Sequence, residues 1–444
     1  MTHPKETSCK LEALDQSLIW HPFTQEQTAN RPLLMARGDG AYLYDANDHP
    51  YLDLISSWWV NLHGHGHPAI AQAIFDQARR LEHVIFAGCT HENAILLCQA
   101  LKLHVPSCLS RFFFSDNGST AVEVALKMAH QYWHNKGHTK RRLVLSLDGA
   151  YHGDTFGAMA AGKKSGFFDP FLSLFFETLS IPYPDTSRND TTLDAREDAA
   201  LLFLQRTLDE RGSEIASLIL EPLVQGASGM RCARASFIDK VIEKVRAYDI
   251  LVIFDEVMTG FYRTGTFLAS DQITHKPDFL CLSKGITGGF LPLAVTLTTD
   301  AIYQAFLDHS FNKAFAHGHS YTANPLACAA ARASLDLLMQ PKTQSAIKAI
   351  CAAQEKGMTF LENEVPMLLR KPRTRGTIAA FDLANMASFK EQLKTAFLKQ
   401  GLLLRPLHNT LYLIPPYVVT TAELESAYHT IADVLKQVVL KKSA

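Results

Sequence analysis

Residues 250–257 read Ile-Leu-Val-Ile-Phe-Asp-Glu-Val, an apolar run of strand length that ends in two adjacent carboxylates, Asp255 and Glu256. A second apolar run at 279–282 is followed almost at once by Lys284. A charged group at the end of a buried strand is costly unless it has a partner. Because the carboxyl ends of parallel strands meet at one edge of a sheet, we expect Asp255 and Lys284 to face the same crevice.

Short strands and helical patterns alternate through the middle of the chain. Apolar residues recur at helical spacing over 120–134, between two of the expected strands. Strands that are interleaved with helices predict an α/β fold with a mostly parallel, doubly wound sheet. The strands are expected at residues 111–114, 143–147, 217–220, 250–254 and 279–282.

The length of 444 residues favours a large domain and a smaller one. The large domain is expected at 61–330. The N-terminal segment 1–60 carries short β patterns and is expected to join residues 331–444 in a smaller α+β domain.

The composition indicates a cytoplasmic globular protein. Net charge is −1, with no basic excess for binding nucleic acid. The first residues, MTHPKETSCKLEALDQ, lack the apolar core of a signal peptide, and no apolar run is long enough to cross a membrane. The eight cysteines form no C-x-x-C pair, which favours reduced, buried thiols over a disulfide framework or a zinc site. No metal is expected.

Lys284 is followed by Gly285, Gly288 and Gly289, which would let the backbone approach a ligand closely. A buried lysine amine can condense with an aldehyde, and Asp255 can pair with a protonated ring nitrogen, as an aspartate does in pyridoxal chemistry. Each residue has a plainer interpretation. Lys284 could be a solvated surface lysine, and Asp255 could cap the next element or bind Mg²⁺.

Polar residues also follow the other strands. Asp116–Thr120 opens a helix, where free N–H groups and the Ser119 hydroxyl would suit an anion, although an ordinary helix cap explains the pattern equally well. In the stretch 148–154, Tyr151 or His152 could stack on a planar ring or form a polar pair within a loop. Glu221 adds one more carboxylate at a strand end.

Together these residues resemble the class III aminotransferases, pyridoxal-phosphate enzymes of fold type I. The resemblance runs from about Trp20 to Tyr417. It is most specific in Asp255-Glu256-Val257, Thr259-Gly260, Arg263-Thr264-Gly265, Ser283-Lys284-Gly285, Gly288-Gly289, His317–Tyr321 and Asn324–Ala327.

The resemblance implies a homodimer whose active sites lie between the subunits, and roles for individual residues. Lys284 would bind pyridoxal 5'-phosphate covalently, Asp255 would pair with its ring nitrogen, and Tyr151 would lie against its ring. The cofactor-binding set would be Gly118, Ser119, Tyr151, Glu221, Asp255 and Lys284, with His319 and Ser320 reaching the phosphate in the neighbouring subunit.

Within the class, the chain resembles the members that act in biotin synthesis. The stretches that carry this likeness are Trp20–Gln25, Ser56–Trp59, Tyr151–Thr155, Arg405-Pro406 and Tyr412–Tyr417. The likeness implies 8-amino-7-oxononanoate as the amino acceptor and S-adenosylmethionine as the donor, with lysine as the alternative donor. Substrate contacts are expected from Phe23, Trp58, Trp59, Tyr151, Gly318 and Arg405.

Arg405 would pair with the acceptor's carboxylate through its planar guanidinium. Neighbouring residues on a strand face opposite ways, so only one tryptophan should face the ligand, and Trp58 is predicted. Adjacent tryptophans are otherwise more often part of a core.

Three positions depart from the pattern of this subgroup. Phe23 stands where Tyr is common, Leu407 where Phe is common, and His319 where Pro is common. These departures bear on the donor and keep open an ω-amino acid or diamine aminotransferase, or a mutase of the glutamate-semialdehyde type. A non-catalytic relative is disfavoured by the presence of Lys284 and Asp255. The chain has no phosphate-binding G-x-x-x-x-G-K-[ST] loop, which argues against a nucleotide enzyme.

Overall fold

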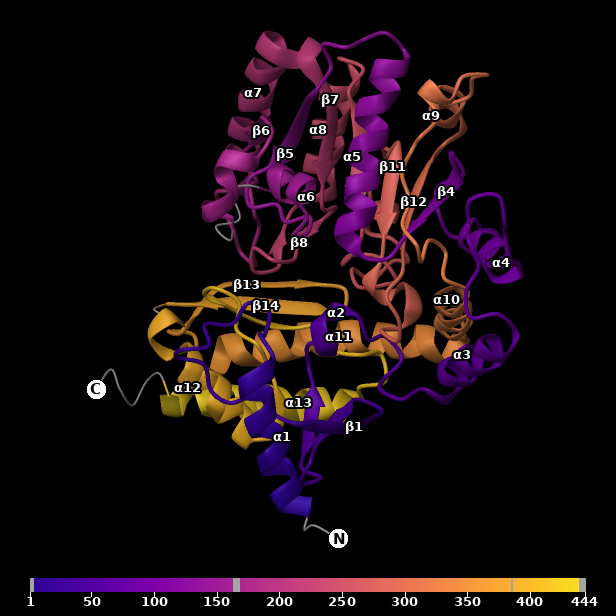
Figure 1. Ribbon diagram of the computed structural model, residues 1–444. Coiled ribbons are helices and arrows are strands. Elements are labelled where there is room, and N and C mark those ends of the chain that lie inside the picture. Colours follow the sequence, from indigo (N-terminus) through magenta and orange to yellow (C-terminus); the bar gives the residue numbers. More distant parts are fainter. Residues whose placement is uncertain (1–3, 163–167, 385, 439–444) are drawn as a thin grey trace.

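The computed structural model describes residues 4–162, 168–384 and 386–438. One part of the molecule is built on a large sheet, and the other carries smaller sheets against long helices (Figure 1). The strand order of the large sheet is β4-β12-β11-β10-β7-β5-β6. These strands are β4 (Leu109–Ser115), β5 (Leu143–Leu147), β6 (Thr178–Ile181), β7 (Ile215–Leu220), β10 (Leu251–Asp255), β11 (Phe279–Leu282) and β12 (Ala294–Thr299).

The large sheet is mostly parallel, and the α/β fold class is confirmed. Ile253 of β10 is in register with Ile219 of β7 on one side and with Phe279 of β11 on the other, both in parallel pairs. Strand β12 was not predicted, and it runs antiparallel between β4 and β11. Strands β4, β5, β7, β10 and β11 therefore all end at the same edge.

Alternate residues of the strands face two separate cores, as the period of a strand requires. On one face Ile253 packs in the same cluster as Val122 and Ala125 of α5 (Gly118–Asn135). On the other face Phe254 packs with Phe237 and Val241 of α8 (Ala235–Arg246).

Helix α5 begins at a capping box. The Asn117 side chain accepts a hydrogen bond from the Thr120 backbone N–H at 3.1 Å, and the Thr120 hydroxyl accepts one from the Asn117 backbone N–H at 3.1 Å. This cap fixes the start of α5 at the end of β4 and so determines where its first free N–H groups point.

The N-terminal and C-terminal parts of the chain meet in the smaller sheets. Strand β15 (Leu402–Leu403) pairs parallel with β3 (Pro50–Asp53), in a sheet completed by β1 (Met35–Asp39) and β2 (Tyr42–Asp45). A second sheet contains β13 (Leu369–Arg375), β14 (Ile378–Leu383) and β16 (Thr410–Leu413). The domain boundaries at residues 60 and 330 stay a prediction.

The remaining helices and strands are α1 (Pro4–Leu18), α2 (Ser56–Trp59), α3 (Pro68–Arg80), α4 (Glu92–Leu101), α6 (Phe156–Ala161), α7 (Leu193–Arg211), β8 (Val224–Gln225), β9 (Arg231–Cys232), α9 (Asp300–Gln304), α10 (Pro325–Leu338), α11 (Pro341–Glu364), α12 (Met386–Lys399) and α13 (Thr421–Val438). Short 3-10 turns occur at Asp169–Leu174, Gly212–Glu214, Ala269–Gln272, Lys284–Thr287 and Phe311–Lys313.

Within the described residues, none of the helices has the length and apolar character that crossing a membrane requires. The same residues contain no group of His, Cys, Asp and Glu side chains arranged to hold a metal ion. Seven cysteines have described side chains, and all are free thiols. Cys89 and Cys108 are exposed, so the prediction that the thiols are buried is wrong for these two, which lie in loops rather than in the core.

Candidate active site

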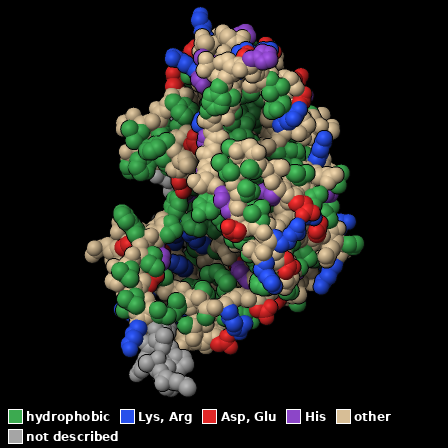
Figure 2. Space-filling model, turned by 45° about the vertical axis from the view of Figure 1, so that its right-hand side comes forward, with side chains coloured by type: hydrophobic (Ala, Val, Ile, Leu, Met, Phe, Trp, Pro, Cys, Tyr) green, Lys and Arg blue, Asp and Glu red, His purple; other side chains and the backbone are tan. Residues whose placement is uncertain are grey.

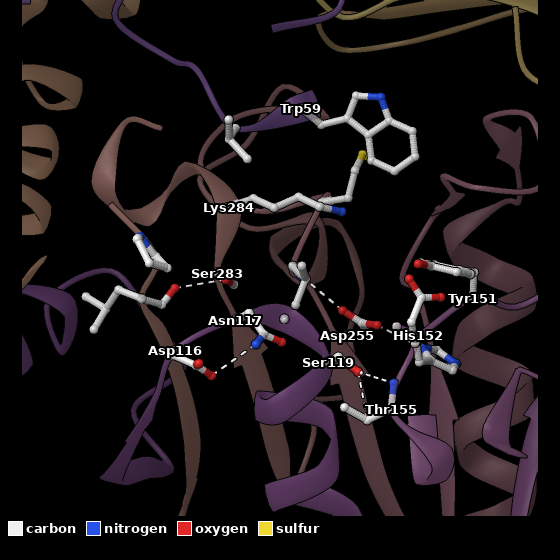
Figure 3. Close-up of a pocket in the computed structure, with 18 of the residues that line it drawn as sticks. Trp59, Asp116, Asn117, Ser119, Tyr151, His152, Thr155, Asp255, Ser283 and Lys284 are labelled. Atoms are coloured by element: carbon white, nitrogen blue, oxygen red, sulfur yellow. Dashed lines mark hydrogen bonds and ion pairs between the residues drawn. The ribbon is translucent and has the colours of Figure 1, made fainter. Parts of the chain in front are cut away.

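A pocket of about 630 Å³ lies at the edge where the parallel strands end. We call it the Lys284 pocket. Figure 3 shows Lys284 crossing it, with Trp59 on one side and Asp255 and Ser119 on the other. Its walls come from the residues after the strands, namely Asp116–Ser119, Tyr151–Thr155, Glu221, Asp255 and Ser283–Lys284, together with Trp59-Val60, Val257-Met258 and Gly289–Leu293.

Lys284 follows β11, and its Nζ lies 4.5 Å from the ring centroid of Trp59. Burial lowers the pKa of Lys284 to about 8, although the nearby carboxylates of Asp255 and Glu221 oppose this shift. A neutral amine is the nucleophilic form of lysine, so the lowered pKa favours condensation with an aldehyde. Lys284 also has a positive φ of 46°, a backbone conformation that costs energy for a residue with a side chain.

Asp255 ends β10 and is buried. One carboxylate oxygen is 2.7 Å from Nδ1 of His152, and the other accepts a hydrogen bond from the Val257 backbone N–H at 3.1 Å. These two donors fix the carboxylate plane and lower the cost of burying its charge. The His152 side chain is buried and its partner is Asp255, a pairing that the sequence analysis did not predict.

Glu221 follows β7 and links two loops of the pocket. Its carboxylate accepts hydrogen bonds from the backbone N–H groups of Tyr151 at 3.1 Å and Gly226 at 2.9 Å. Burial and, to a smaller extent, the charge of Asp255 raise the pKa of Glu221 to about 7. Burial also raises the pKa of the Tyr151 phenol, helped by Asp154, so that Tyr151 stays protonated at neutral pH.

The start of α5 forms another wall of the pocket. A Cβ atom added to Gly118 would collide with the Val257 side chain, so a glycine is required for α5 to approach this closely. The Ser119 hydroxyl is 2.7 Å from the Thr155 hydroxyl and accepts a hydrogen bond from the Thr155 backbone N–H at 3.0 Å. The first N–H groups of a helix suit an anion, and Gly118 and Ser119, the first two residues of α5, line the pocket.

The two tryptophans are arranged differently from the prediction. The segment Ser56–Trp59 is a short helix with a kink, not a strand, and Ser56, Ser57 and Trp59 all have positive φ. Trp59 is the residue that lines the Lys284 pocket, while Trp58 does not. The choice of Trp58 rested on a strand, and that premise is wrong because the backbone turns sharply here. A contact between Trp58 and the substrate stays a prediction.

Hydrogen bonds with the neighbouring Asp53 and with the distant Ile414 hold this strained backbone. The Asp53 carboxylate accepts from the backbone N–H groups of Ile55 at 3.0 Å and Ser57 at 2.7 Å, and the Ser56 hydroxyl donates to the Ile414 carbonyl at 2.6 Å. A strained conformation costs about 1–3 kcal/mol per residue and persists only when its surroundings determine it.

Arg263 and Tyr412 fix Trp59 itself. The buried guanidinium of Arg263 donates to the carbonyls of Asn61 at 2.8 Å and Pro415 at 2.8 Å, with a longer contact to the Trp59 carbonyl at 3.4 Å. The Trp59 indole N–H donates to the Tyr412 hydroxyl at 3.1 Å. Neither role was predicted, although Arg263 belongs to a motif that the sequence analysis singled out.

Phe23, Trp58 and Arg405 form a separate cluster, which we call the aromatic rim. The Arg405 guanidinium lies 4.5 Å from the Trp58 ring centroid, and the Phe23 ring meets Trp58 edge-on at 5.8 Å. Arg405 is also close enough to Tyr412 to affect the pKa of that phenol, which burial raises to about 12. Tyr412 thus connects the aromatic rim with Trp59.

Residues 318–320 do not reach the Lys284 pocket of the same chain. Gly318 and Ser320 are exposed, whereas the His319 ring turns into its own loop, where Nδ1 accepts a hydrogen bond from the Tyr321 backbone N–H at 3.2 Å. Their predicted contact with a neighbouring subunit stays a prediction.

The donor set of the Lys284 pocket fits pyridoxal phosphate. It offers an amine for the aldehyde, a carboxylate for the ring nitrogen, an aromatic side chain beside the ring, and the start of a helix for the phosphate. The glycine at position 118 leaves room where a Cβ atom would already be too close to Val257.

Comparison with known proteins agrees with this fit. The family described as aminotransferase class-III matches residues 23–435. This chain belongs to the class III aminotransferases. It is therefore a pyridoxal-phosphate-dependent aminotransferase, and Lys284 lines the pocket at the strand ends.

Three relatives illustrate the range of similarity. An adenosylmethionine-8-amino-7-oxononanoate aminotransferase of Synechococcus elongatus is 48% identical over 95% of this chain and 99% of its own length. The crystal structure of the enzyme of the same name from Methanocaldococcus jannaschii has a TM-score of 0.90, with 33% identity over 97% of this chain and 99% of that one. An amine transaminase from an uncultivated Pseudomonas species, in its PLP-bound form, has a TM-score of 0.86 and 29% identity over 96% and 98% of the two chains.

Proposed function

We propose that this aminotransferase converts 8-amino-7-oxononanoate to 7,8-diaminononanoate in biotin synthesis, with S-adenosylmethionine as the amino donor. Two of the relatives described above carry that activity in their names. Two contacts support the proposal most strongly: the Trp59 ring lies beside Lys284, and the ring of the adjacent Trp58 lies beside Arg405. A substrate path from Lys284 to Arg405 would run along both rings.

This path matches the chemistry of the acceptor, an apolar chain with a keto group near one end and a carboxylate at the other. The Trp59 ring lies against Lys284, and the Trp58 ring lies against the Arg405 guanidinium. The aromatic faces would contact the apolar chain, and the planar guanidinium would bind the carboxylate.

When bound, pyridoxal phosphate supplies the carbonyl carbon that takes up the amino group and a ring that accepts electron density from the substrate. Lys284 would hold it covalently, Gly118 and Ser119 its phosphate, and Tyr151 one side of its ring. Asp255, fixed by His152 and Val257, would keep a proton on the ring nitrogen.

Lys284 would also move the proton of the reaction. Its amine, with a pKa lowered to about 8, can remove a proton from the amine-bearing carbon of the donor and deliver it to the carbon that was the cofactor's aldehyde carbon. Donor and acceptor would use the pocket in turn. Lys284 and Asp255 would act in both half-reactions, whereas Arg405 would act on the acceptor.

We also propose that the chain works as a homodimer in the cytoplasm. Trp20, Ile85, Phe311 and Tyr321 are large apolar side chains that are more than half exposed in one chain, and a partner subunit that covered them would bury apolar surface. The exposed Gly318 and Ser320 adjoin Tyr321. The free thiols are typical of a reducing compartment.

A general amine transaminase is the second candidate. Its supporting observation is the likeness to the amine transaminase structure, together with Phe23 and His319, which depart from the biotin-synthesis pattern.

Single half-reactions, followed by the visible absorbance of the holoenzyme, separate the candidates. We expect S-adenosylmethionine to bleach the band of the lysine-bound cofactor, and 8-amino-7-oxononanoate to restore it with formation of the diamine. If lysine bleaches the band and S-adenosylmethionine does not, lysine is the amino donor. Restoration by simple keto acids or amine-derived ketones, but not by 8-amino-7-oxononanoate, would contradict the proposed acceptor.

A further inference from the structure

Ser119 and Glu123 lie four residues apart on α5, so their side chains project from the same face of the helix, toward the segment 153–158, which ends in the first turn of α6. Two glycines make room for them. A Cβ atom at Gly153, which has a φ of 125°, would overlap Ser119, and a Cβ atom at Gly157 would overlap the Glu123 carboxylate. The segment 153–158 therefore packs closely against the side chains of Ser119 and Glu123.

Thr155 connects them. Its hydroxyl donates to Oε1 of Glu123, the same oxygen that accepts the Ala158 backbone N–H at 2.9 Å. Its backbone N–H donates to Oγ of Ser119 at 3.0 Å, and the Ser119 and Thr155 hydroxyls are 2.7 Å apart. Figure 3 shows Ser119 and Thr155 joined in this way beside Asp255.

The hydrogen atoms of this chain of contacts can be assigned. A hydroxyl has one proton, and an ionised carboxylate accepts only, so the Thr155 proton points to Glu123. In the contact between the two hydroxyls, Ser119 must therefore be the donor. Its proton then has two possible acceptors, Oγ1 of Thr155 and an anion at the start of α5.

We propose that Thr155 and Glu123 are positioning residues for the cofactor phosphate, a proposal that rests on the assignment of Ser119 to that phosphate. The Thr155 backbone N–H holds Oγ of Ser119 in place whichever way its proton turns. Charge-assisted hydrogen bonds are the stronger ones, so the Ser119 proton turns to the phosphate when it binds. Glu123 keeps the Thr155 hydroxyl oriented throughout, so only the Ser119 proton changes its acceptor.

The apoenzyme, titrated with pyridoxamine 5'-phosphate and with pyridoxamine by fluorescence, tests the proposal. For Thr155→Val we expect the Kd for pyridoxamine 5'-phosphate to rise about tenfold, because the residue whose backbone N–H holds Ser119 loses its anchor on Glu123, while the Kd for pyridoxamine stays unchanged. Thr155→Ser keeps both hydroxyl contacts and should restore the affinity. Glu123→Ala should weaken binding of the phosphate ligand roughly threefold, and it serves as a second variant if Thr155→Val does not fold.

Ser119→Ala separates this proposal from the assignment beneath it. We expect Ser119→Ala to weaken binding of the phosphate ligand, and Thr155→Val to add nothing further in the double variant. If Ser119→Ala has no effect, Ser119 does not bind the phosphate, and both ideas fail. If Ser119→Ala weakens binding of the phosphate ligand but Thr155→Val does not, only the positioning role is wrong. The same conclusion follows if Thr155→Val weakens the binding of both ligands equally.

Discussion

The two ends of the substrate path are built in different ways. Around Lys284 and Asp255, the reactive groups stand at the ends of β10 and β11, in the middle of the large sheet. Around Trp59 and Arg405, they stand on segments far apart in the sequence, which only the smaller sheets and hydrogen bonds bring together. Figure 2 shows that one side of the molecule is hollowed between the part with the large sheet and the part with the smaller sheets.

We call the region around Lys284 and Asp255 the sheet end, and the region around Trp59 and Arg405 the aromatic end. The sheet end would carry out the chemistry, and the aromatic end would recognise the acceptor. The sheet end positions its groups by backbone pairing that any class III aminotransferase can share. The aromatic end depends on a strained turn at Ser56–Trp59, held by the side chains of Asp53 and Arg263. Changes at the sheet end should therefore stop all transamination, while changes at the aromatic end should alter the choice of acceptor.

The largest effect is expected for Lys284→Ala. Loss of the general base should slow both half-reactions by about 10⁴-fold, the upper end of what such a group contributes, because the variant also loses the covalent link to the cofactor. Lys348→Ala, at an exposed position of α11, is the control. Stopped-flow absorbance measures both steps. If Lys284→Ala turned over near the rate of the unchanged protein, Lys284 would have no part in the mechanism.

Asp255→Asn and Glu256→Gln compare two adjacent buried carboxylates. Asp255→Asn should lower kcat by roughly 10²–10³-fold, because the neutral amide no longer holds a proton on the cofactor ring. Glu256 accepts hydrogen bonds from the backbone of Ala269 at 2.6 Å and Ser270 at 2.9 Å, outside the pocket. Glu256→Gln should therefore lower Tm and leave both half-reactions intact. Equal kinetic damage from the two variants would contradict this division.

Arg405→Ala tests the aromatic end. It should lower kcat/KM for 8-amino-7-oxononanoate by about 10- to 100-fold, the effect of losing a hydrogen-bonded charge pair, with the donor half-reaction unchanged. Arg405→Lys keeps the charge but not the planar fork, so its kcat/KM should lie between the values of the unchanged protein and of Arg405→Ala. Damage to the donor step as large as that to the acceptor step would argue against a carboxylate partner at this position.

The pH dependence of cofactor uptake should show the smallest effect. Since the pKa of Lys284 is lowered to about 8, the rate at which apoenzyme binds pyridoxal phosphate covalently should rise with pH and level off above about 8. Below that value it should fall by up to about tenfold per pH unit, because only the neutral amine reacts. Glu221→Gln removes a charge that raises this pKa and should move the midpoint to lower pH. A midpoint that moves upward would contradict the electrostatics described here.

The sheet end could be predicted from the sequence because its signals are local. An apolar run followed by Asp255, and another followed by Lys284, indicate strand ends without knowledge of the rest of the chain. The antiparallel β12 was not predicted, although Val295-Thr296-Leu297-Thr298 alternates between apolar and polar residues and so carries a local strand signal.

The aromatic end could not be predicted in the same way. The orientation of Trp58 and Trp59 depends on positive φ angles at serines and a tryptophan, which no residue preference indicates. The contacts of Trp59 with Tyr412, and of Arg263 with Pro415, join segments more than 150 positions apart. His152 was considered for stacking or polar pairing, and only the fold places it on Asp255.

The central claim is that Lys284 carries the cofactor. Reduction of the holoenzyme with borohydride, followed by digestion and peptide mass spectrometry, tests it most directly. The pyridoxyl group should be found on Lys284 and lost in Lys284→Ala. A pyridoxyl group on another lysine, or none on the reduced holoenzyme, would contradict the account.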